Sequence, residues 1–191
     1  MKKLYVLLML SLIMFGATQA NAVTIDFENM PDLTPVNNFY SSFGVNFQNA
    51  VSLTAGLSLN EFDYPPSSGL VAIGDDNAPI TIYFDNLASN IFANFTYSSL
   101  LTFSAFDANS HLVGTFTNNQ LSNLGTTQLI SLTFSDIKSL EIAGSVNNSF
   151  IMDNFNFTES RVSQVPEPST FFLLGAGLFG IIGYRKYRII S

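Results

Sequence analysis

The sequence predicts an all-β domain, an antiparallel two-sheet sandwich of the jelly-roll type, with an apolar segment on either side of it. Apolar and polar residues alternate through most of the chain, as they do in strands with one face in a core. Clusters of Asn, Asp, Ser and Gly separate these stretches and favour turns. No window before residue 165 has the 3.6-residue apolar repeat of a helix, so a sandwich of short strands is the expected architecture.

The first 22 residues are predicted to be a secretory signal peptide, 1–22. Lys2 and Lys3 precede an apolar run over 4–15, and small residues follow that run. Ala20 and Ala22 stand three residues and one residue before a cleavage site that precedes Val23, and a cut after Ala20 is the second choice. The run is short and ends in small polar residues, which disfavours a retained membrane anchor.

Ten strands are expected in the sandwich domain, which we place at residues 23–164. The alternation is clearest where apolar residues alternate with Thr, Ser or Tyr, in 80–84, 101–105 and 130–134. The full set of expected strands is 23–28, 44–47, 51–54, 80–84, 91–97, 101–105, 112–117, 130–134, 140–143 and 150–158. Fifteen of the nineteen Phe residues lie in this domain, and we expect them to form much of its core.

Composition and charge exclude several classes of protein. Charged residues make up 11% of the chain, against about a quarter in an ordinary soluble domain, and there is no Cys. The predicted domain keeps two of the seven basic and thirteen of the fourteen acidic residues, so its net charge is −11. These properties exclude a nucleic-acid binder, a thiolate metal site and a Cys–His nucleophile pair. Contact with an acidic polysaccharide would need divalent cations.

Residues 165–191 form a second patterned end. They open with an extended joint, because prolines on both sides of a Glu fit neither a helix interior nor a central strand: Val165, Pro166, Glu167 and Pro168. An apolar run over 171–184 follows, predicted as a short transmembrane helix of about 21 Å against a usual hydrocarbon core of about 30 Å. Three stop-transfer charges come next and place this end in the cytoplasm: Arg185, Lys186 and Arg188.

The order of these three elements resembles the PEP-CTERM protein-sorting signal of Gram-negative bacteria, over about residues 165–188. The resemblance implies export, transient retention in the inner membrane and processing by an exosortase, with Pro166-Glu167-Pro168 as the recognition element. It also implies a final location at the cell surface or in the extracellular polysaccharide matrix. An ordinary C-terminal anchor behind a Pro-rich linker is the alternative. The tail departs from the family pattern in continuing to Ser191.

The domain itself resembles, through less specific motifs, a lectin-like domain found in PEP-CTERM proteins. The matching pieces are 25–28 in the first strand, Tyr40-x-x-Phe43-Gly44-Val45-x-Phe47, and 150–155 in the last strand. The resemblance implies a jelly roll in which an acidic first strand meets an Asp of the last strand around a structural calcium ion.

Asp153 is the most informative candidate site residue. Its alternation groups it with three apolar residues of the last expected strand: Ile151, Phe155 and Phe157. It should therefore point inward, and a buried carboxylate needs a cation or several N–H donors. Calcium binds carboxylate, amide and carbonyl oxygens, so we expect a structural Ca²⁺ held by Asp153 with Glu28 and Asp26. The alternatives are that Asp153 caps backbone amides, or that a bulge breaks the alternation.

Three further groups have polar or aromatic character that a site could use. Asp75-Asp76-Asn77 offers adjacent oxygen donors, although a solvated turn is the favoured interpretation. Tyr64, in the Tyr64-Pro65-Pro66 loop, could stack on a pyranose ring or pack on its own prolines. His111 is the only His and follows a turn, so we expect it to be exposed.

Together these features favour an exported, non-catalytic protein of the cell surface or exopolysaccharide matrix that binds carbohydrate weakly. The expected partners are an exosortase, the inner membrane for a time, and exopolysaccharide. A secreted polysaccharide-active enzyme is one alternative, because a glycosidase could use carboxylate pairs such as Glu61 with Asp63 or Asp75 with Asp76. No hydrolase motif of the Gly-x-Ser-x-Gly or His-Glu-x-x-His kind occurs. A self-assembling surface-layer subunit is the other alternative, because low charge density and many strand edges permit it.

Overall fold

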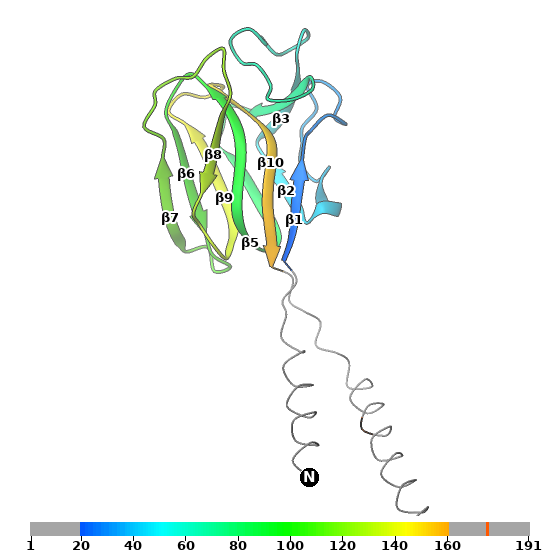
Figure 1. The fold of residues 1–191 in the computed structure, drawn as a ribbon, viewed down its shortest axis with the longest axis vertical. Helices are drawn as coiled ribbons and strands as arrows, with labels where there is room; N and C mark the ends of the chain where they lie inside the picture. The colour runs from blue at the N-terminus through cyan, green and yellow to red at the C-terminus, as the bar shows by residue number, and fades with distance from the viewer. Residues whose placement is uncertain (1–19, 161–174, 176–191) are drawn as a thin grey trace, which may run out of the picture. The chain divides into compact units, whose positions relative to one another are not determined.

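The computed structural model describes residues 20–160 and residue 175. The sandwich lies in one of two compact units of the chain, Gln19–Arg161 (Figure 1). The signal-peptide run, the Pro-Glu-Pro joint, the apolar run over 171–184 and the basic cluster lie outside the described residues, apart from position 175. Within the described part of the chain, no helix has the length and apolar character needed to span a membrane.

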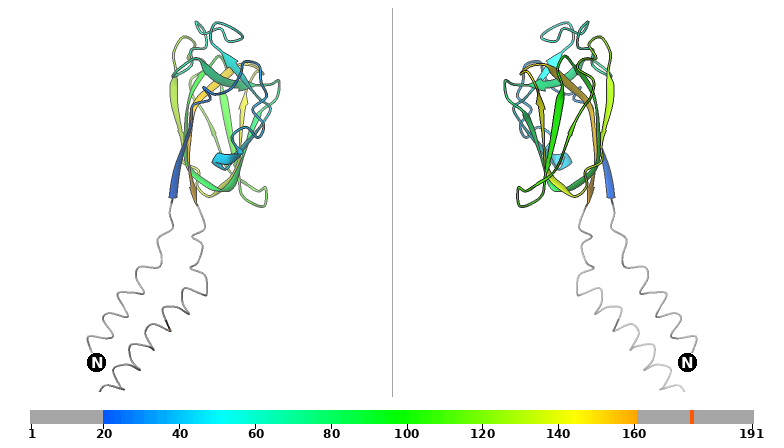
Figure 2. Two further views of the ribbon diagram at one scale, coloured as in Figure 1. Left: turned by 90° about the vertical axis from the view of Figure 1, so that its right-hand side faces the viewer. Right: turned by 90° about the vertical axis from the view of Figure 1, so that its left-hand side faces the viewer.

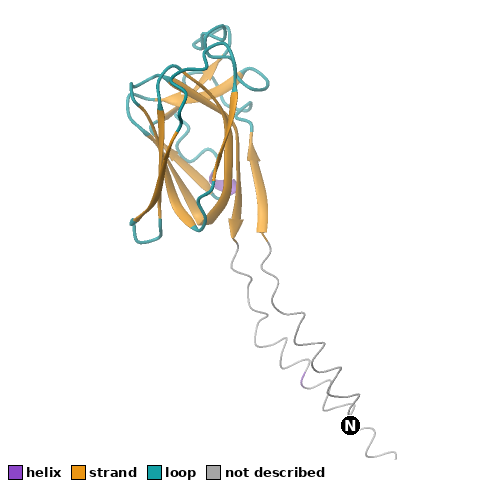
Figure 3. Cartoon of the chain, turned by 60° about the vertical axis from the view of Figure 1, so that its left-hand side comes forward, coloured by secondary structure: helices purple, strands orange, loops and turns teal. Residues whose placement is uncertain are grey.

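The described domain consists of β-strands and one short 3-10 helix, η1 (Ser41–Phe43) (Figure 3). The strands are β1 (Ala20–Ile25), β2 (Val45–Gln48), β3 (Ala50–Thr54), β4 (Val71–Asp75), β5 (Ile80–Tyr97), β6 (Leu101–Phe106), β7 (Leu112–Thr117), β8 (Gln128–Leu132), β9 (Ile137–Gly144) and β10 (Phe150–Ser160). All the ladders between them are antiparallel. The predicted all-β antiparallel sandwich is therefore confirmed, and the jelly-roll type stays a prediction.

Two strands differ from the expected set. The expected strands 80–84 and 91–97 are one strand, because 85–90 continue the path of β5. The sequence pattern does not predict β4. Every residue of β4 is buried, and a strand that is buried on both faces shows no alternation of apolar and polar residues.

The long strand β5 joins two facing layers. Its first part pairs with β2 and β9, and its second part pairs with β8 and β10. The sheet runs in the order β3-β4-β10-β5-β9-β6-β7, with β1 on β10 and both β2 and β8 on β5. One layer therefore holds β2, β9, β6 and β7, the other holds β3, β4, β10, β1 and β8, and the two layers face each other (Figures 2 and 3).

Phe side chains fill the space between the layers. Phe95 of β5 packs edge-on against Phe103 of β6, with ring centroids 5.4 Å apart. Phe84 lies 5.1 Å from Phe157 of β10. Several Phe side chains are at most 1% exposed: Phe27, Phe47, Phe84, Phe103, Phe155 and Phe157. The prediction that Phe forms much of the core is confirmed.

A bulge in β10 changes which way its side chains face. The register with β5 shifts between Asp153 and Asn156, and Asn154 has a φ of 51°. Before the bulge, Ile151 packs in a small outer cluster, whereas Phe155, after it, packs in the main core. Asp153 has the parity of Ile151 and is buried under the connection between β3 and β4, because its Oδ2 accepts the N–H of Ser68. The grouping of Asp153 with Phe155 and Phe157 was therefore wrong, since the bulge separates them.

The first and last strands of the domain are neighbours. β1 pairs with the second half of β10, with Ala20 opposite Ser160 and Ile25 opposite Phe155. β1 thus takes in Ala20 and the two residues after it, which the sequence assigns to the signal peptide. Cleavage before Val23 would leave β1 with residues 23–25 only.

Candidate functional site

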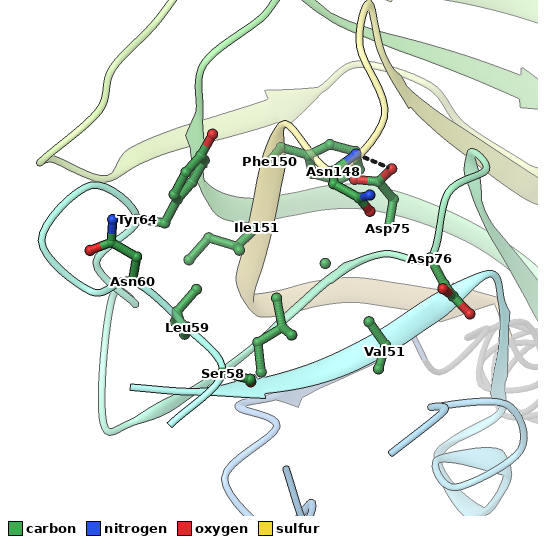
Figure 4. Close-up of a pocket in the computed structure, with 12 residues that line it drawn as sticks. Val51, Ser58, Leu59, Asn60, Tyr64, Asp75, Asp76, Asn148, Phe150 and Ile151 are labelled. Carbon is green, nitrogen blue, oxygen red and sulfur yellow. Dashed lines mark hydrogen bonds between the residues drawn. The ribbon is translucent and has the colours of Figure 1, made fainter. Parts of the chain in front are cut away.

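A pocket of about 320 Å³ opens where β3, β4 and β10 meet the loop between β3 and β4 (Figure 4). Apolar and polar side chains line it: Val51, Leu53, Ser58, Leu59, Asn60, Tyr64, Gly74, Asp75, Asp76, Asn148, Phe150 and Ile151. The hollow follows from the register of three strands, because Gly74 lies between Val51 and Ile151. A side chain at Gly74 would reach within 2.9 Å of Leu53, so glycine keeps this row open.

Asp75 is the most unusual residue of the pocket. Its side chain is only 5% exposed. Its Oδ2 accepts the backbone N–H of Asn148 at 2.7 Å, whereas its Oδ1 has no hydrogen-bond partner among the residues that the structure describes. Burial raises the pKa of this carboxyl, the N–H of Asn148 opposes that rise, and the nearby charge of Asp76 adds to it. A buried carboxylate oxygen without a donor is costly, which makes Asp75 the candidate polar group of the pocket.

Two turns fix the polar rim of the pocket. Asn147 donates from Nδ2 to the backbone oxygen of Asn77 at 2.9 Å. Asn148 donates from Nδ2 to Oδ1 of Asn77 at 2.8 Å, while its backbone N–H binds Asp75. The turn after β4 and the turn before β10 are thereby joined, and Asp75 is held between them.

The Asp75-Asp76-Asn77 stretch agrees only in part with the favoured interpretation as a solvated turn. Asp76 and Asn77 are exposed, and Asn77 has a φ of 58°. Asp75 is buried, because the turn before β10 closes over it. The sequence contains the residues of this site but shows nothing of their contact with Asn148, which lies 73 positions further along the chain.

Tyr64 forms one wall of the pocket (Figure 4). Its ring is half-buried and packs against the outer cluster that contains Leu59 and Ile151. Its hydroxyl donates to Oγ of Ser98 at 2.7 Å. Tyr64 is therefore oriented by contacts outside its own loop rather than by its two neighbouring prolines alone, and one side of the ring lines the pocket.

The predicted calcium ligands lie elsewhere, around the segment just before β4. Glu28 accepts the N–H groups of Leu70 at 3.1 Å and Val71 at 3.0 Å. Asp153, fully buried, accepts the N–H of Ser68 at 2.8 Å and that of Asn154 at 2.6 Å. Burial raises the pKa of Asp153, these N–H groups oppose the rise, and the charge of Glu28 adds to it. Asp153 thus caps backbone amides, which is one of the alternatives weighed above.

Asp26 is exposed, and its Oδ1 accepts the backbone N–H of Glu28 at 3.3 Å. Among the described residues, no group of three or more His, Cys, Asp or Glu side chains is placed to hold a metal ion. Each carboxylate oxygen of Glu28 and Asp153 accepts a hydrogen bond from at least one backbone N–H group. These amides stabilise the two carboxylates in the way that the predicted ion would. Calcium binding by Glu28, Asp153 and Asp26 stays a prediction. If it is correct, millimolar EDTA lowers the melting temperature of the domain, and an unchanged value ends the hypothesis.

The hydroxyl of Tyr40 lies near the same carboxylates. It is buried and has no hydrogen-bond partner among the described residues. Burial, with the charges of Asp26 and Glu28, raises the pKa of Tyr40 to about 12. The hydroxyl therefore stays protonated at neutral pH and cannot act as a base.

The other carboxylates considered for catalysis are engaged in local turns. Oε2 of Glu61 accepts the N–H of Gly56 at 2.9 Å, and Oδ2 of Asp63 accepts from Nδ2 of Asn60 at 2.7 Å. Neither carboxylate lines the pocket. The side chain of His111 is 79% exposed and lies 3.5 Å from Asp107, so its predicted exposure is confirmed.

Comparisons with known proteins concern both the C-terminal sorting segment and the β-sandwich domain. The family model of the PEP-CTERM protein-sorting motif matches residues 164–188. The predicted sorting motif is thereby confirmed, and it indicates an exported protein. A search of curated proteins finds no match to the chain.

Several solved structures are similar to the domain at low identity. A DUF4465 family protein from Bacteroides caccae is 14% identical, with a TM-score of 0.48 over 73% of this chain and 99% of that one. A family 29 carbohydrate-binding module is 9% identical, with a TM-score of 0.41 over 73% and 89% of the two chains. The N-terminal part of xylanase 10B from Clostridium thermocellum, solved with xylohexaose, is 13% identical, with a TM-score of 0.41 over 72% and 29%.

Proposed function

We propose that the chain is the precursor of a non-catalytic protein of the cell surface or exopolysaccharide matrix, which binds a neutral glycan weakly in the pocket of β3, β4 and β10. The observation that carries the proposal is Oδ1 of Asp75, a buried acceptor with no partner within residues 20–160. A sugar hydroxyl is the donor that fits it, because a hydroxyl supplies a hydrogen without a charge to desolvate.

The rest of the pocket suits one face of a sugar ring. Val51, Leu53 and Ile151 supply the apolar part of the lining, here called the floor. The ring of Tyr64 stands beside Ile151 (Figure 4). A pyranose has apolar C–H faces and a polar rim, so its face can lie on this floor while a rim hydroxyl reaches Asp75. The pocket is open and small, which supports weak binding of one or two sugar units.

Charge restricts the class of glycan. Asp75 and Asp76 line the same pocket, and the predicted domain carries a net charge of −11. A uronic acid or sulfated sugar would meet like charges there. The proposed ligand is therefore an uncharged hexose or pentose unit of a neutral polysaccharide.

The ends of the chain supply its route to the matrix. In this proposal the signal peptide, 1–22, directs export, and the apolar run over 171–184 with its basic cluster holds the precursor in the inner membrane. An exosortase recognises the Pro-Glu-Pro joint at 165–168 and processes the tail. The family match at 164–188 supports this route.

A glycan array of the purified domain, residues 23–164, with and without calcium, tests the binding. We expect signals for neutral glycans and a loss of about tenfold or more in affinity in Asp75→Asn, which places an N–H₂ where the free acceptor stood. Asp85→Asn is the matched control, because Asp85 is exposed and does not line the pocket. A blank array for the wild type, or equal affinities for wild type and Asp75→Asn, removes the proposal. Hydrolysis of a polysaccharide that stops on substitution of Asp75 or Asp76 would replace it with the enzyme alternative.

A further inference from the structure

We infer that the domain pairs with a second copy of itself through the side formed by residues 108–135. This neutral face carries β7, the connection after it, and β8. It shares no residue with the pocket, since none of the residues that line the pocket falls within 108–135. The inference is independent of glycan binding and concerns what the mature protein assembles into.

Charge is distributed unevenly along the domain. Residues 108–135 contain no Asp, Glu, Lys or Arg, although the predicted domain carries thirteen acidic residues and two basic ones. Two copies of a domain with a net charge of −11 repel each other over most of their surfaces. The neutral face is the part of the surface where two copies can approach without bringing acidic side chains together.

The neutral face also exposes large apolar side chains. Six large apolar side chains between 41% and 66% exposed lie on it: Leu112, Val113, Phe116, Leu121, Leu124 and Leu129. One of them, Phe116, is held by the core, because its ring lies 5.8 Å from that of Phe103. Exposed apolar side chains in a segment that has no charged residue are typical of an association surface.

The neutral face contains two strands that pair on one side only. β7 ends the strand order and pairs only with β6, and β8 pairs only with β5, within the described part of the chain. Proteins usually protect such edges with Lys, with Pro, or with a segment that covers them. Neither Lys nor Pro occurs in β7 or β8. β7 carries a bulge at Val113, between its pairs with Ala105 and Phe106. The edge that is free to pair with another strand, among the described residues, is therefore that of residues 114–117.

The opposite side of the sandwich is protected at β3 and β2, whereas β1 there pairs only with β10 within the described residues. The segment before η1 covers β3 and β2 by backbone bonds, from Leu33 N–H to Ser52 O at 2.8 Å and from Phe47 N–H to Asn37 O at 2.8 Å. The form of the assembly follows instead from charge, because both copies must use the neutral face when the rest of each surface is acidic. A closed pair results, in which β7 of each copy lies antiparallel to β7 of the other about a two-fold axis.

Sedimentation equilibrium of the purified domain, residues 23–164, tests this inference. The wild type should be a dimer, and Val113→Glu should raise the dimer dissociation constant at least about 100-fold, because the two-fold axis brings the two new charges close together. Val146→Glu is the matched control, since Val146 is 63% exposed in the turn before β10, outside the neutral face. It should stay dimeric.

Circular dichroism establishes whether each variant is folded. If Val113→Glu does not fold, Leu112→Glu replaces it, with Leu57→Glu, at a 73% exposed position outside the neutral face, as its control. A wild type that is monomeric at concentrations up to about 1 mM overturns the inference. A folded Val113→Glu that dimerises as the wild type does also overturns it, and a series of species larger than the dimer overturns the closed pair.

Discussion

Replacing Asp75 by Asn should stabilise the domain at neutral pH while it weakens the binding of glycan. Oδ2 of Asp75 accepts a backbone N–H, and the single oxygen of Asn can keep that bond. Oδ1 has no partner in the described part of the chain, so exchanging it for an amide N–H₂ breaks no hydrogen bond there. The substitution removes a buried negative charge and leaves the packing almost unchanged.

The size of the effect follows from the burial of that oxygen. An unpaired buried polar group costs about 1–3 kcal/mol, and more when it is charged. We therefore expect the free energy of unfolding of Asp75→Asn to exceed that of the wild type by about 1–3 kcal/mol at pH 7. For a domain of this size each kcal/mol corresponds to about 4 °C in melting temperature.

The pH dependence gives the sharper assay. Burial raises the pKa of Asp75 in the folded domain above its ordinary value of 3.8, so the folded domain holds this proton more tightly than the unfolded chain. The Asp75 contribution to stability is therefore present below about pH 4 and is lost as the pH rises through the raised pKa. Urea unfolding from about pH 3 to 8 should show the two proteins converging at low pH and diverging as the pH rises.

Asp85→Asn, at an exposed position, should stay within about 0.5 kcal/mol of the wild type throughout. An Asp75→Asn variant that is less stable than the wild type at pH 7, or a difference that does not shrink at low pH, would refute the reasoning. Either result would mean that Oδ1 of Asp75 has a donor in the folded domain.

Two further substitutions test the packing. Gly69→Ala should destabilise the domain by more than Gly56→Ala, because both glycines have positive φ but only at Gly69 would a Cβ lie 2.2 Å from the carboxyl of Glu28. Gly56→Ala should lower the free energy of unfolding by about 1–2 kcal/mol from backbone strain alone. If urea unfolding shows the same decrease for both variants, the close contact of the Glu28 carboxylate with this segment is contradicted. Phe103→Ala should cost about 3–5 kcal/mol by creating a core cavity. Phe62→Ala, at an 84% exposed position, should change the free energy of unfolding by less than about 0.5 kcal/mol.

The alternation of residues predicts most of this fold, because most strands have one face in the core and one outside it. It does not predict β4, whose two faces are both buried. It also assigns Asp153 to the wrong face, although the predicted burial of its side chain is confirmed. The reason is the left-handed backbone of Asn154, an Asn among several in the sequence, and nothing in the local pattern marks it as a bulge.

For the pocket, too, the sequence predicts residue types but not the contacts between residues that are far apart in the chain. The sequence draws attention to Tyr64 and Asp75, since an aromatic ring and a carboxylate are typical of sugar sites. It predicts neither that they share a pocket nor that Asn148 buries Asp75, because both depend on strand order and on the contact of two turns. Contacts of this kind, between residues far apart in the chain, are set by tertiary packing rather than by any local pattern.

The direction of β10 has a mechanical consequence. Its first residues, Phe150 and Ile151, line the pocket, and its last, Ser160, precedes the sorting segment, roughly 30 Å further along the strand. When a glycan held in the pocket and an anchor beyond Ser160 are pulled apart, the tension runs along β10 itself. The ladders to β5 and β1 lie alongside that line, so they are loaded in shear and their hydrogen bonds share the force. Under the proposed function β10 would thus carry the force between ligand and anchor, and the domain should release a bound glycan before it unfolds.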